Sequence, residues 1–135
     1  MSWPSVIILV PVGRRLPLET RIRSLGVVPD PATGDERLHW RGCSYHLDLS
    51  GGILADYETD ELDEVAARIG EPPYAVYAAC QSMDAARALL TEVLPGVDGL
   101  LDTNHHDVLD TGEFLRLLAR FPHWDWRRTP SAELG

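Results

Sequence analysis

The chain has 135 residues, which suits one domain with a substantial hydrophobic core and is too short for two. Hydrophobic residues make up 44% of the chain and charged residues 24%, a balance that excludes the disordered and fibrous classes. Its 21 acidic and 12 basic residues give a net charge of −9 at pH 7, so direct binding to nucleic acid is not expected.

The acidic charge is concentrated in the middle of the chain. Residues 42–115 contain fifteen acids against two arginines, a net charge of −13, whereas segments 1–41 and 116–135 each carry about +2. A surface with this imbalance attracts basic partners and speeds association with them at low salt. The alternative interpretation is that the acids form solvated helix faces that favour solubility.

The first elements follow from apolar spacing. Residues 5–12 are almost all apolar and largely β-branched, which predicts a central strand buried on both faces. This run is too short for a membrane span and no basic region precedes it, so we expect a cytoplasmic protein without membrane association. Leu18, Ile22 and Leu25 then recur with helical spacing and predict a short helix.

Strand patterns dominate the next forty residues. A surface loop is predicted at residues 29–35, which are dense in turn-forming residues. Residues 38–49 and 53–59 are typical of two antiparallel strands. The apolar phase of the first strand inverts at Gly42, which predicts a β-bulge there.

A three-residue turn, Ser50-Gly51-Gly52, is predicted between these two strands. This register keeps one face apolar because it places Tyr45 beside Tyr57 on the core side. It also sets His46 opposite Asp56 on the other face. One glycine of the turn should adopt a positive φ angle.

The middle of the chain predicts a helix, a strand and a second helix. Acids fill the first turn of the helix expected at residues 60–69, where they suit the positive end of the helix dipole. Residues 74–80 are apolar at nearly every position, as in an interior strand, and Ser82 is a favourable N-cap for the next helix. Cys43 and Cys80 lack metal-binding spacing and are expected to be core thiols.

A polar turn lies between two apolar segments near the C-terminus. Residues 97–101 and 108–109 are typical of hairpin strands around the turn Asp102-Thr103-Asn104-His105-His106-Asp107. A helix should follow, because Asp110 and Glu113 have the spacing of a capping box ahead of an apolar stripe.

The C-terminal tail, residues 122–135, carries Trp124 and Trp126. These tryptophans either pack over the domain or form an aromatic patch for a partner. The whole chain, residues 1–135, is predicted to form a single α+β domain. We expect a mixed or antiparallel sheet with three to four helices, including elements of a ferredoxin-like β-α-β arrangement.

The polar turn could serve several kinds of chemistry. Calcium binding is excluded because the turn departs from the EF-hand spacing. His105, His106 and Asp107 could contribute to a transition-metal site, although adjacent histidines point apart in a strand. Asp102 and Asp110 are predicted to oppose each other near the hairpin and could act as an acid-base pair, yet no motif identifies a substrate.

Several segments together resemble a known family. A helix followed by GEPP and a strand, an alanine-rich helix and the run VDGLLDTNHHDVLDTGEF extend over about residues 38–120. This order resembles small actinobacterial and myxobacterial immunity proteins of the Sit type, which often have GRPP, an alanine-rich helix and a GVVDDDHG-style hairpin. The chain departs from the pattern at the hairpin tip, where His106-Asp107 replaces the usual glycine. The residues that match the hairpin motif are Val97, Asp98, Leu100, Leu101, Asp102, Thr103, His105 and Asp107.

The resemblance implies a protein that binds and neutralises a cognate polymorphic toxin. Because no catalytic motif is visible, we expect a non-enzymatic monomer or weak dimer, without metal or cofactor, that covers the active cleft of a basic toxin domain. One alternative is a small metal-binding protein or hydrolase that uses His105, His106 and Asp107 with His46. Another is a module that dimerises through an exposed strand edge. The expected contact residues are Asp56, Glu58, Asp60, Glu61, Glu64, Asp102, His105, His106, Asp107, Asp110, Trp124 and Trp126.

Overall fold

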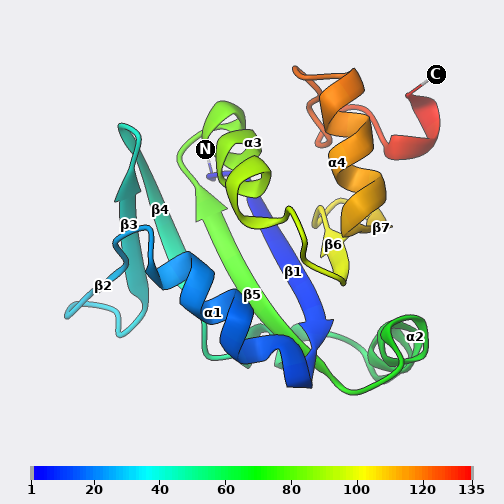
Figure 1. Ribbon diagram of the computed structural model, residues 1–135, viewed down its shortest axis with the longest axis horizontal. Coiled ribbons are helices and arrows are strands. Elements are labelled where there is room, and N and C mark those ends of the chain that lie inside the picture. The colour runs from blue at the N-terminus through cyan, green and yellow to red at the C-terminus, as the bar shows by residue number, and fades with distance from the viewer. Residues whose placement is uncertain (1, 135) are drawn as a thin grey trace.

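The computed structural model describes residues 2–134, which form one seven-stranded antiparallel sheet with four α-helices (Figure 1). The strands are β1 (Ser5–Pro11), β2 (Val28–Pro29), β3 (Glu36–Trp40), β4 (Cys43–Asp48), β5 (Pro73–Cys80), β6 (Leu100–Asp102) and β7 (Val108–Asp110). The helices are α1 (Arg15–Arg23), α2 (Thr59–Ile69), α3 (Met83–Val93) and α4 (Thr111–Arg120), with short 3-10 helices η1 (Val12–Arg14), η2 (Gly52–Asp56) and η3 (Ser131–Glu133). None of the helices in this part of the chain has the length and apolarity needed to cross a membrane.

The strand order is β2-β3-β4-β5-β1-β6-β7, and every neighbouring pair is antiparallel. Helix α1 lies on the connection from β1 towards β4, and α3 connects β5 to β6, so each connection skips one strand of the sheet. The four strands β4-β5-β1-β6 therefore have the ferredoxin-like β-α-β-β-α-β arrangement. The predicted α+β class and the interior position of β1 are both confirmed.

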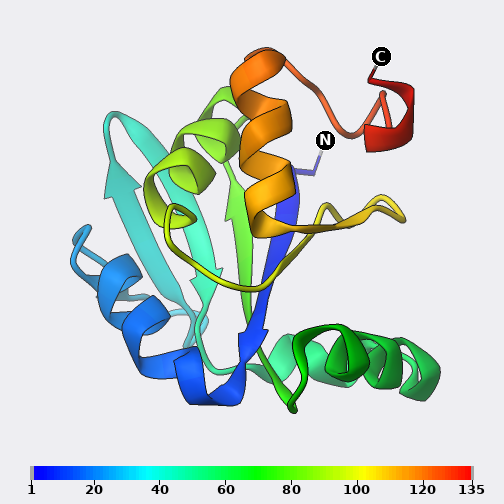
Figure 2. The same ribbon diagram turned by 45° about the vertical axis from the view of Figure 1, so that its right-hand side comes forward.

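The two faces of the sheet are covered unequally. Helices α1, α3 and α4 cover one face of the sheet, the helical face (Figure 2). Val6, Ile8 and Val10 of β1 point to this face, and Ile7 and Leu9 point to the other face. All five are buried, which explains the continuous apolar run in the sequence. Among the helices of residues 2–134, η2 and α2 are the two that pack on the second face, at one end, and we call this second face the open face.

Residues 38–49, predicted as one strand with a bulge, form the two strands β3 and β4. A two-residue turn at Arg41 and Gly42 joins them, and the φ angles of both residues are positive, 51° and 77°. Such angles are typical of a type I′ hairpin turn. Because this turn places Leu38 opposite Tyr45, the apolar phase inverts along the sequence without any inserted residue. The bulge prediction is wrong.

The segment 53–59, predicted as the returning strand, contains no strand. The chain turns away after β4 because the Asp48 carboxylate accepts hydrogen bonds from the Ser50 nitrogen at 2.9 Å and the Ser50 hydroxyl at 2.6 Å. Gly51 follows with a φ angle of 83°, which confirms the positive φ predicted in this glycine pair. The predicted hairpin between these segments is wrong, since η2 and α2 take its place.

The neighbours of β4 are therefore β3 and β5, which changes the predicted pairs. Tyr45 lies in the core with 1% exposure, as predicted. Tyr57 packs on the opposite side of the sheet, so the predicted pairing of the two tyrosines is wrong. His46 is aligned with Ala79 of β5 and not with Asp56, which corrects the predicted cross-strand contact.

The C-terminal tail belongs to the core. Trp124 and Trp126 are 4% and 2% exposed, and their ring centroids lie 5.6 and 5.4 Å from that of Phe114 on α4. The guanidinium of Arg87 on α3 donates a hydrogen bond to the Trp124 carbonyl at 2.7 Å. Packing over the domain is therefore confirmed, and the prediction of these tryptophans as exposed partner anchors is wrong because their rings are buried.

The helix caps agree only in part with the predictions. The Ser82 hydroxyl accepts a hydrogen bond from the Ala85 nitrogen at 3.1 Å, so the predicted N-cap of α3 is confirmed. Helix α4 begins where expected, but Asp110 and Glu113 form no capping box there. The Thr111 hydroxyl instead donates to a carbonyl of the loop before β6 at 2.6 Å, which ties the helix start to the sheet.

The two cysteines are free thiols. Cys80 is fully buried, and burial raises the pKa of its thiol to about 12, so the thiol stays protonated and unreactive at neutral pH. Cys43 is half-buried at the edge of the core. The core-thiol prediction is thus confirmed for Cys80 and holds in part for Cys43.

Candidate functional site

An open hollow of about 390 Å³ lies on the open face, where η2 and the start of α2 meet the sheet. Three of its lining residues are acids that the sequence analysis predicted as contact residues, and they come from three separate elements. We call this feature the acidic hollow. Its lining residues are Ile7, Ile53, Asp56, Tyr57, Glu61, Tyr77, Asp102 and Asn104.

The floor of the acidic hollow follows from the strand register. Tyr77 of β5 and Asp102 of β6 are both aligned with Ile7 of β1, so these three residues form one row across three strands. Side chains alternate between faces along a strand, and Leu101 points into the helical core. Asp102 is therefore directed to the open face, where it is half-buried.

The Tyr57 hydroxyl donates a hydrogen bond to Oδ2 of Asp102 at 2.6 Å. Oδ1 of the same carboxylate accepts from the Asn104 nitrogen at 2.8 Å. Burial, followed by the contact with Asp102, raises the pKa of Tyr57 far above its ordinary value, so the hydroxyl remains a donor at physiological pH. These two donors hold the carboxylate in a fixed orientation beside the hollow.

The rim carries the other two acids. Asp56 ends η2, and Glu61 lies in the first turn of α2, where its carboxylate accepts a hydrogen bond from the Glu58 nitrogen at 2.9 Å. No ion pair within residues 2–134 involves Asp56, Glu61 or Asp102. The hollow therefore has three carboxylates without a cationic side chain to balance them. The predicted contact residues Glu58, Asp60 and Glu64 are exposed beside it on and before α2.

The open face continues past the hollow to an aromatic pair. The rings of Trp3 and His46 lie 5.1 Å apart between centroids, and Trp3 is 38% exposed. His46 is in the same row as Ala79 and Ser5, which is two residues along the strands from the row of Tyr77. We call Trp3 and His46 the aromatic shelf, and it adjoins the acidic hollow on one continuous surface.

The polar turn between β6 and β7 is closed by a hydrogen bond from the Thr103 nitrogen to the Asp107 carbonyl at 3.0 Å. Asn104 and His106 adopt φ angles of 64° and 62°, left-handed conformations that are uncommon for residues other than glycine. His105 and His106 are exposed at the tip, away from the lining of the hollow.

Asp107 has a structural role that the sequence analysis missed. Its carboxylate is half-buried and accepts hydrogen bonds from the nitrogen and the hydroxyl of Ser131, at 2.7 and 2.8 Å. These bonds attach the C-terminal tail to the hairpin. Asp107 therefore fixes the tail to the hairpin, and its role as a partner contact stays a prediction.

Asp110 does not oppose Asp102. The register aligns Asp110 with Leu100 and Asp102 with Val108, so the two carboxylates are two residues apart along the strands. The prediction that Asp102 and Asp110 oppose each other is therefore wrong. Among the described residues, no group of three or more His, Cys, Asp or Glu side chains is arranged to hold a metal ion. The expected absence of bound metal stays a prediction for elemental analysis.

Sequence reasoning identified the acids of the site but not its aromatic walls. Tyr57 was placed on the core side and Tyr77 inside a uniformly buried strand, whereas both line the hollow. The signal in the sequence was the spacing of Tyr74 and Tyr77, which are three residues apart in β5 and so lie on opposite faces of the sheet. Trp3 precedes β1 and carried no pattern at all.

Comparisons with known proteins add no further identification. The chain matches no protein-family model, no curated protein and no solved structure. The resemblance to Sit-type immunity proteins over residues 38–120 stays a prediction, and the acidic hollow carries the functional interpretation.

Proposed function

We propose that this protein is a cytoplasmic, non-enzymatic immunity protein that binds a basic toxin domain through the acidic hollow and the exposed acids around α2. The observation that carries the proposal is the set of three carboxylates in one hollow without a cationic partner in the described chain. Unbalanced carboxylates repel one another, and an incoming cationic surface relieves that repulsion.

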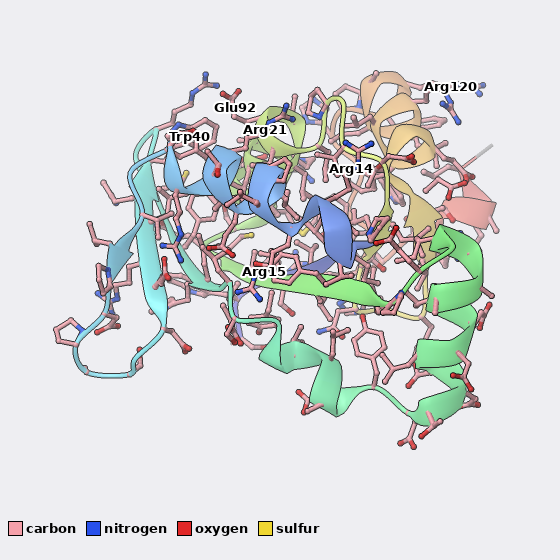
Figure 3. The ribbon with its side chains drawn as sticks, turned by 60° about the horizontal axis from the view of Figure 1, so that its bottom comes forward. Arg14, Arg15, Arg21, Trp40, Glu92 and Arg120 are labelled. Atoms are coloured by element: carbon pink, nitrogen blue, oxygen red, sulfur yellow. The ribbon has the colours of Figure 1, made fainter. Side chains whose placement is uncertain are left out.

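The distribution of charge over the fold supports one preferred docking side. Figure 3 shows Arg14 of η1, Arg15 and Arg21 of α1, and Arg120 of α4. Helices α1 and α4 both cover the helical face. The exposed acids of η2 and α2 lie on the other side of the sheet. A cationic partner is therefore steered towards the open face and away from the helical face.

The proposed mechanism is occlusion. A toxin that acts on nucleic acid carries arginine and lysine side chains in its cleft, because they neutralise phosphates. The carboxylates of the acidic hollow and α2 would pair with those side chains and exclude the substrate from the cleft. The immunity protein itself performs no chemical step in this scheme.

Co-expression with the toxin domain encoded beside its gene tests the proposal. We expect the wild-type protein to protect cells and to form a complex, and the triple variant Asp56→Lys, Glu58→Lys, Asp60→Lys to lose at least tenfold in affinity. Raising the salt concentration from about 0.05 M to about 0.5 M shortens the Debye length roughly threefold and should slow association.

A second triple variant with the same change of net charge is the control. Asp35→Lys, Glu92→Lys and Asp98→Lys alter exposed acids outside the acidic hollow, so this variant should bind nearly as well as the wild type. Absence of both protection and binding for the wild-type protein would refute the immunity function. Equal losses in the two variants would show that net charge matters and the proposed surface does not.

A further inference from the structure

We infer that the acidic hollow receives one arginine side chain of the partner protein, with the guanidinium group at Asp102 and the aliphatic stem against the apolar floor. This inference rests on the proposed function and names the chemical group recognised at its site. The hollow lies on the open face beside η2 and the start of α2, and it is open to an incoming side chain.

The lining of the hollow matches the parts of an arginine side chain. Ile7 and Ile53 provide apolar surface for the aliphatic stem. Tyr57 and Tyr77 also line the hollow, and aromatic rings are favourable neighbours for a planar guanidinium. A guanidinium is also more weakly hydrated than an ammonium group, so its transfer into a half-buried site costs less than that of lysine.

Asp102 retains the capacity to bind this group. Each of its oxygens accepts one hydrogen bond, from the Tyr57 hydroxyl and the Asn104 nitrogen. An ionised carboxylate accepts about four hydrogen bonds, so one acceptor position remains on each oxygen. Two free positions on one oriented carboxylate suit the paired N–H donors of a guanidinium. Asp56 and Glu61 at the rim add the long-range attraction.

A metal ion is a poorer occupant than an extended cation. The three carboxylates come from η2, α2 and β6, and within residues 2–134 no group of three such side chains converges as a metal requires. An arginine carried by a protein also suits the surroundings better than a free amino acid does. The open face extends from the hollow to Trp3 and His46, which residues flanking the arginine can contact.

A titration of the ¹⁵N-labelled protein with three blocked tripeptides tests this inference. The probes are Ac-Gly-Arg-Gly-NH₂, its lysine counterpart and its citrulline counterpart, which has nearly the shape of arginine but no charge. We expect saturable amide shifts at Tyr57, Asp102 and Asn104 with the arginine peptide, weaker binding of the lysine peptide and no binding of the citrulline peptide. Equal shifts with all three peptides, or none with arginine, would overturn the inference.

Two variants locate the binding group. Asp102→Asn should weaken arginine binding at least tenfold, and its amide spectrum shows whether the fold persists. Glu61→Gln removes a rim charge but keeps an oxygen that can accept from the Glu58 nitrogen, so it tests the site with the helix cap retained. It should weaken binding severalfold. Asp63→Asn changes an exposed acid of α2 outside the hollow and should leave binding unchanged.

The outcomes separate this inference from the proposed function. A toxin complex without saturable binding of the arginine peptide would refute the arginine site and leave the immunity function standing. Binding of the arginine peptide without any toxin complex would support the arginine site and refute the immunity function. Free arginine amide that binds as tightly as the tripeptide would show a small-molecule site and would also overturn the assignment of a protein partner.

Discussion

Tyr74 is a buried phenol whose ionisation links the stability of the fold to pH. Its hydroxyl donates a hydrogen bond to the Leu49 carbonyl at 2.5 Å, and its ring is 3% exposed. Burial is the main reason that the pKa of this hydroxyl is raised to about 12 from the ordinary value of 10.0. The phenol therefore ionises more readily in the unfolded chain than in the folded one.

The sign of the pH effect follows from this difference. Below pH 10 both states hold the proton and the contribution of Tyr74 to stability is complete. Between about pH 10 and pH 12 the unfolded chain loses the proton first, so the free energy of unfolding falls by up to about 1.4 kcal/mol for each pH unit. Tyr74→Phe should cost about 1 kcal/mol at pH 7, through the lost hydrogen bond, and should flatten the decline above pH 10.

Urea unfolding at pH 7, 10 and 11 measures both effects. Other buried phenols also ionise in this range, so the comparison between the variant and the wild type isolates the share of Tyr74. If the free energy of unfolding of Tyr74→Phe fell as steeply between pH 10 and pH 11 as that of the wild type, the assignment to Tyr74 would be contradicted.

At the scale of elements, the C-terminal tail is held to the domain by aromatic packing and by Asp107. Trp126 is almost fully buried, with its ring centroid 5.4 Å from that of Phe114 and 5.7 Å from that of Trp124. Ser131 adds the hydrogen bonds to the hairpin. The tail therefore covers apolar surface of α4 that would otherwise meet water.

Trp126→Ala should lower the free energy of unfolding by about 3 to 5 kcal/mol, because it removes a large buried ring and leaves a cavity. The control His123→Ala changes an exposed residue of the same tail and should stay within about 0.5 kcal/mol of the wild type. Chemical unfolding followed by circular dichroism measures both. A loss below about 1 kcal/mol for Trp126→Ala would show that the tail is not part of the cooperative core.

Elements whose structure depends on the spacing of their own residues are predicted well from the sequence. The strand β1, the helices α1 and α3 and the N-cap at Ser82 follow from local spacing and were predicted correctly, although α1 ends at Arg23, before Leu25. The Arg41-Gly42 turn was missed because a two-residue hairpin turn and a bulge both invert the apolar phase, and arginine is an unusual residue in a left-handed conformation.

The sequence predicted the negative charge of the candidate site but not its location on the fold. The excess of acids pointed to a surface for cations, and Asp56, Glu61 and Asp102 do meet in one hollow. Which face they share depends on the strand order, and that order is determined by pairing between segments far apart in the chain. Tyr57 lies on the open face because the chain turns at Gly51 and continues as η2. The sequence analysis predicted a strand in place of η2, so it placed Tyr57 on the wrong face.

At the scale of the whole molecule, the face that fewer helices cover is also the face that carries the acidic hollow. The helical face carries α1, α3 and α4 with the labelled arginines, and the open face carries the acidic hollow with the exposed acids beside it. Association with a cationic partner should therefore depend on orientation, since the acidic hollow and the exposed acids of α2 attract it to the open face. We predict that the open face is the binding surface.

Hydrogen exchange of the protein alone and in complex with the neighbouring toxin domain tests that claim most directly. Backbone amides covered by a partner exchange more slowly, so the binding surface is read without any mutation. We predict slower exchange in residues 53–64 and 100–104, with little change in α1 and α4. Slower exchange confined to α1, α3 and α4, with residues 53–64 and 100–104 unchanged, would contradict the account.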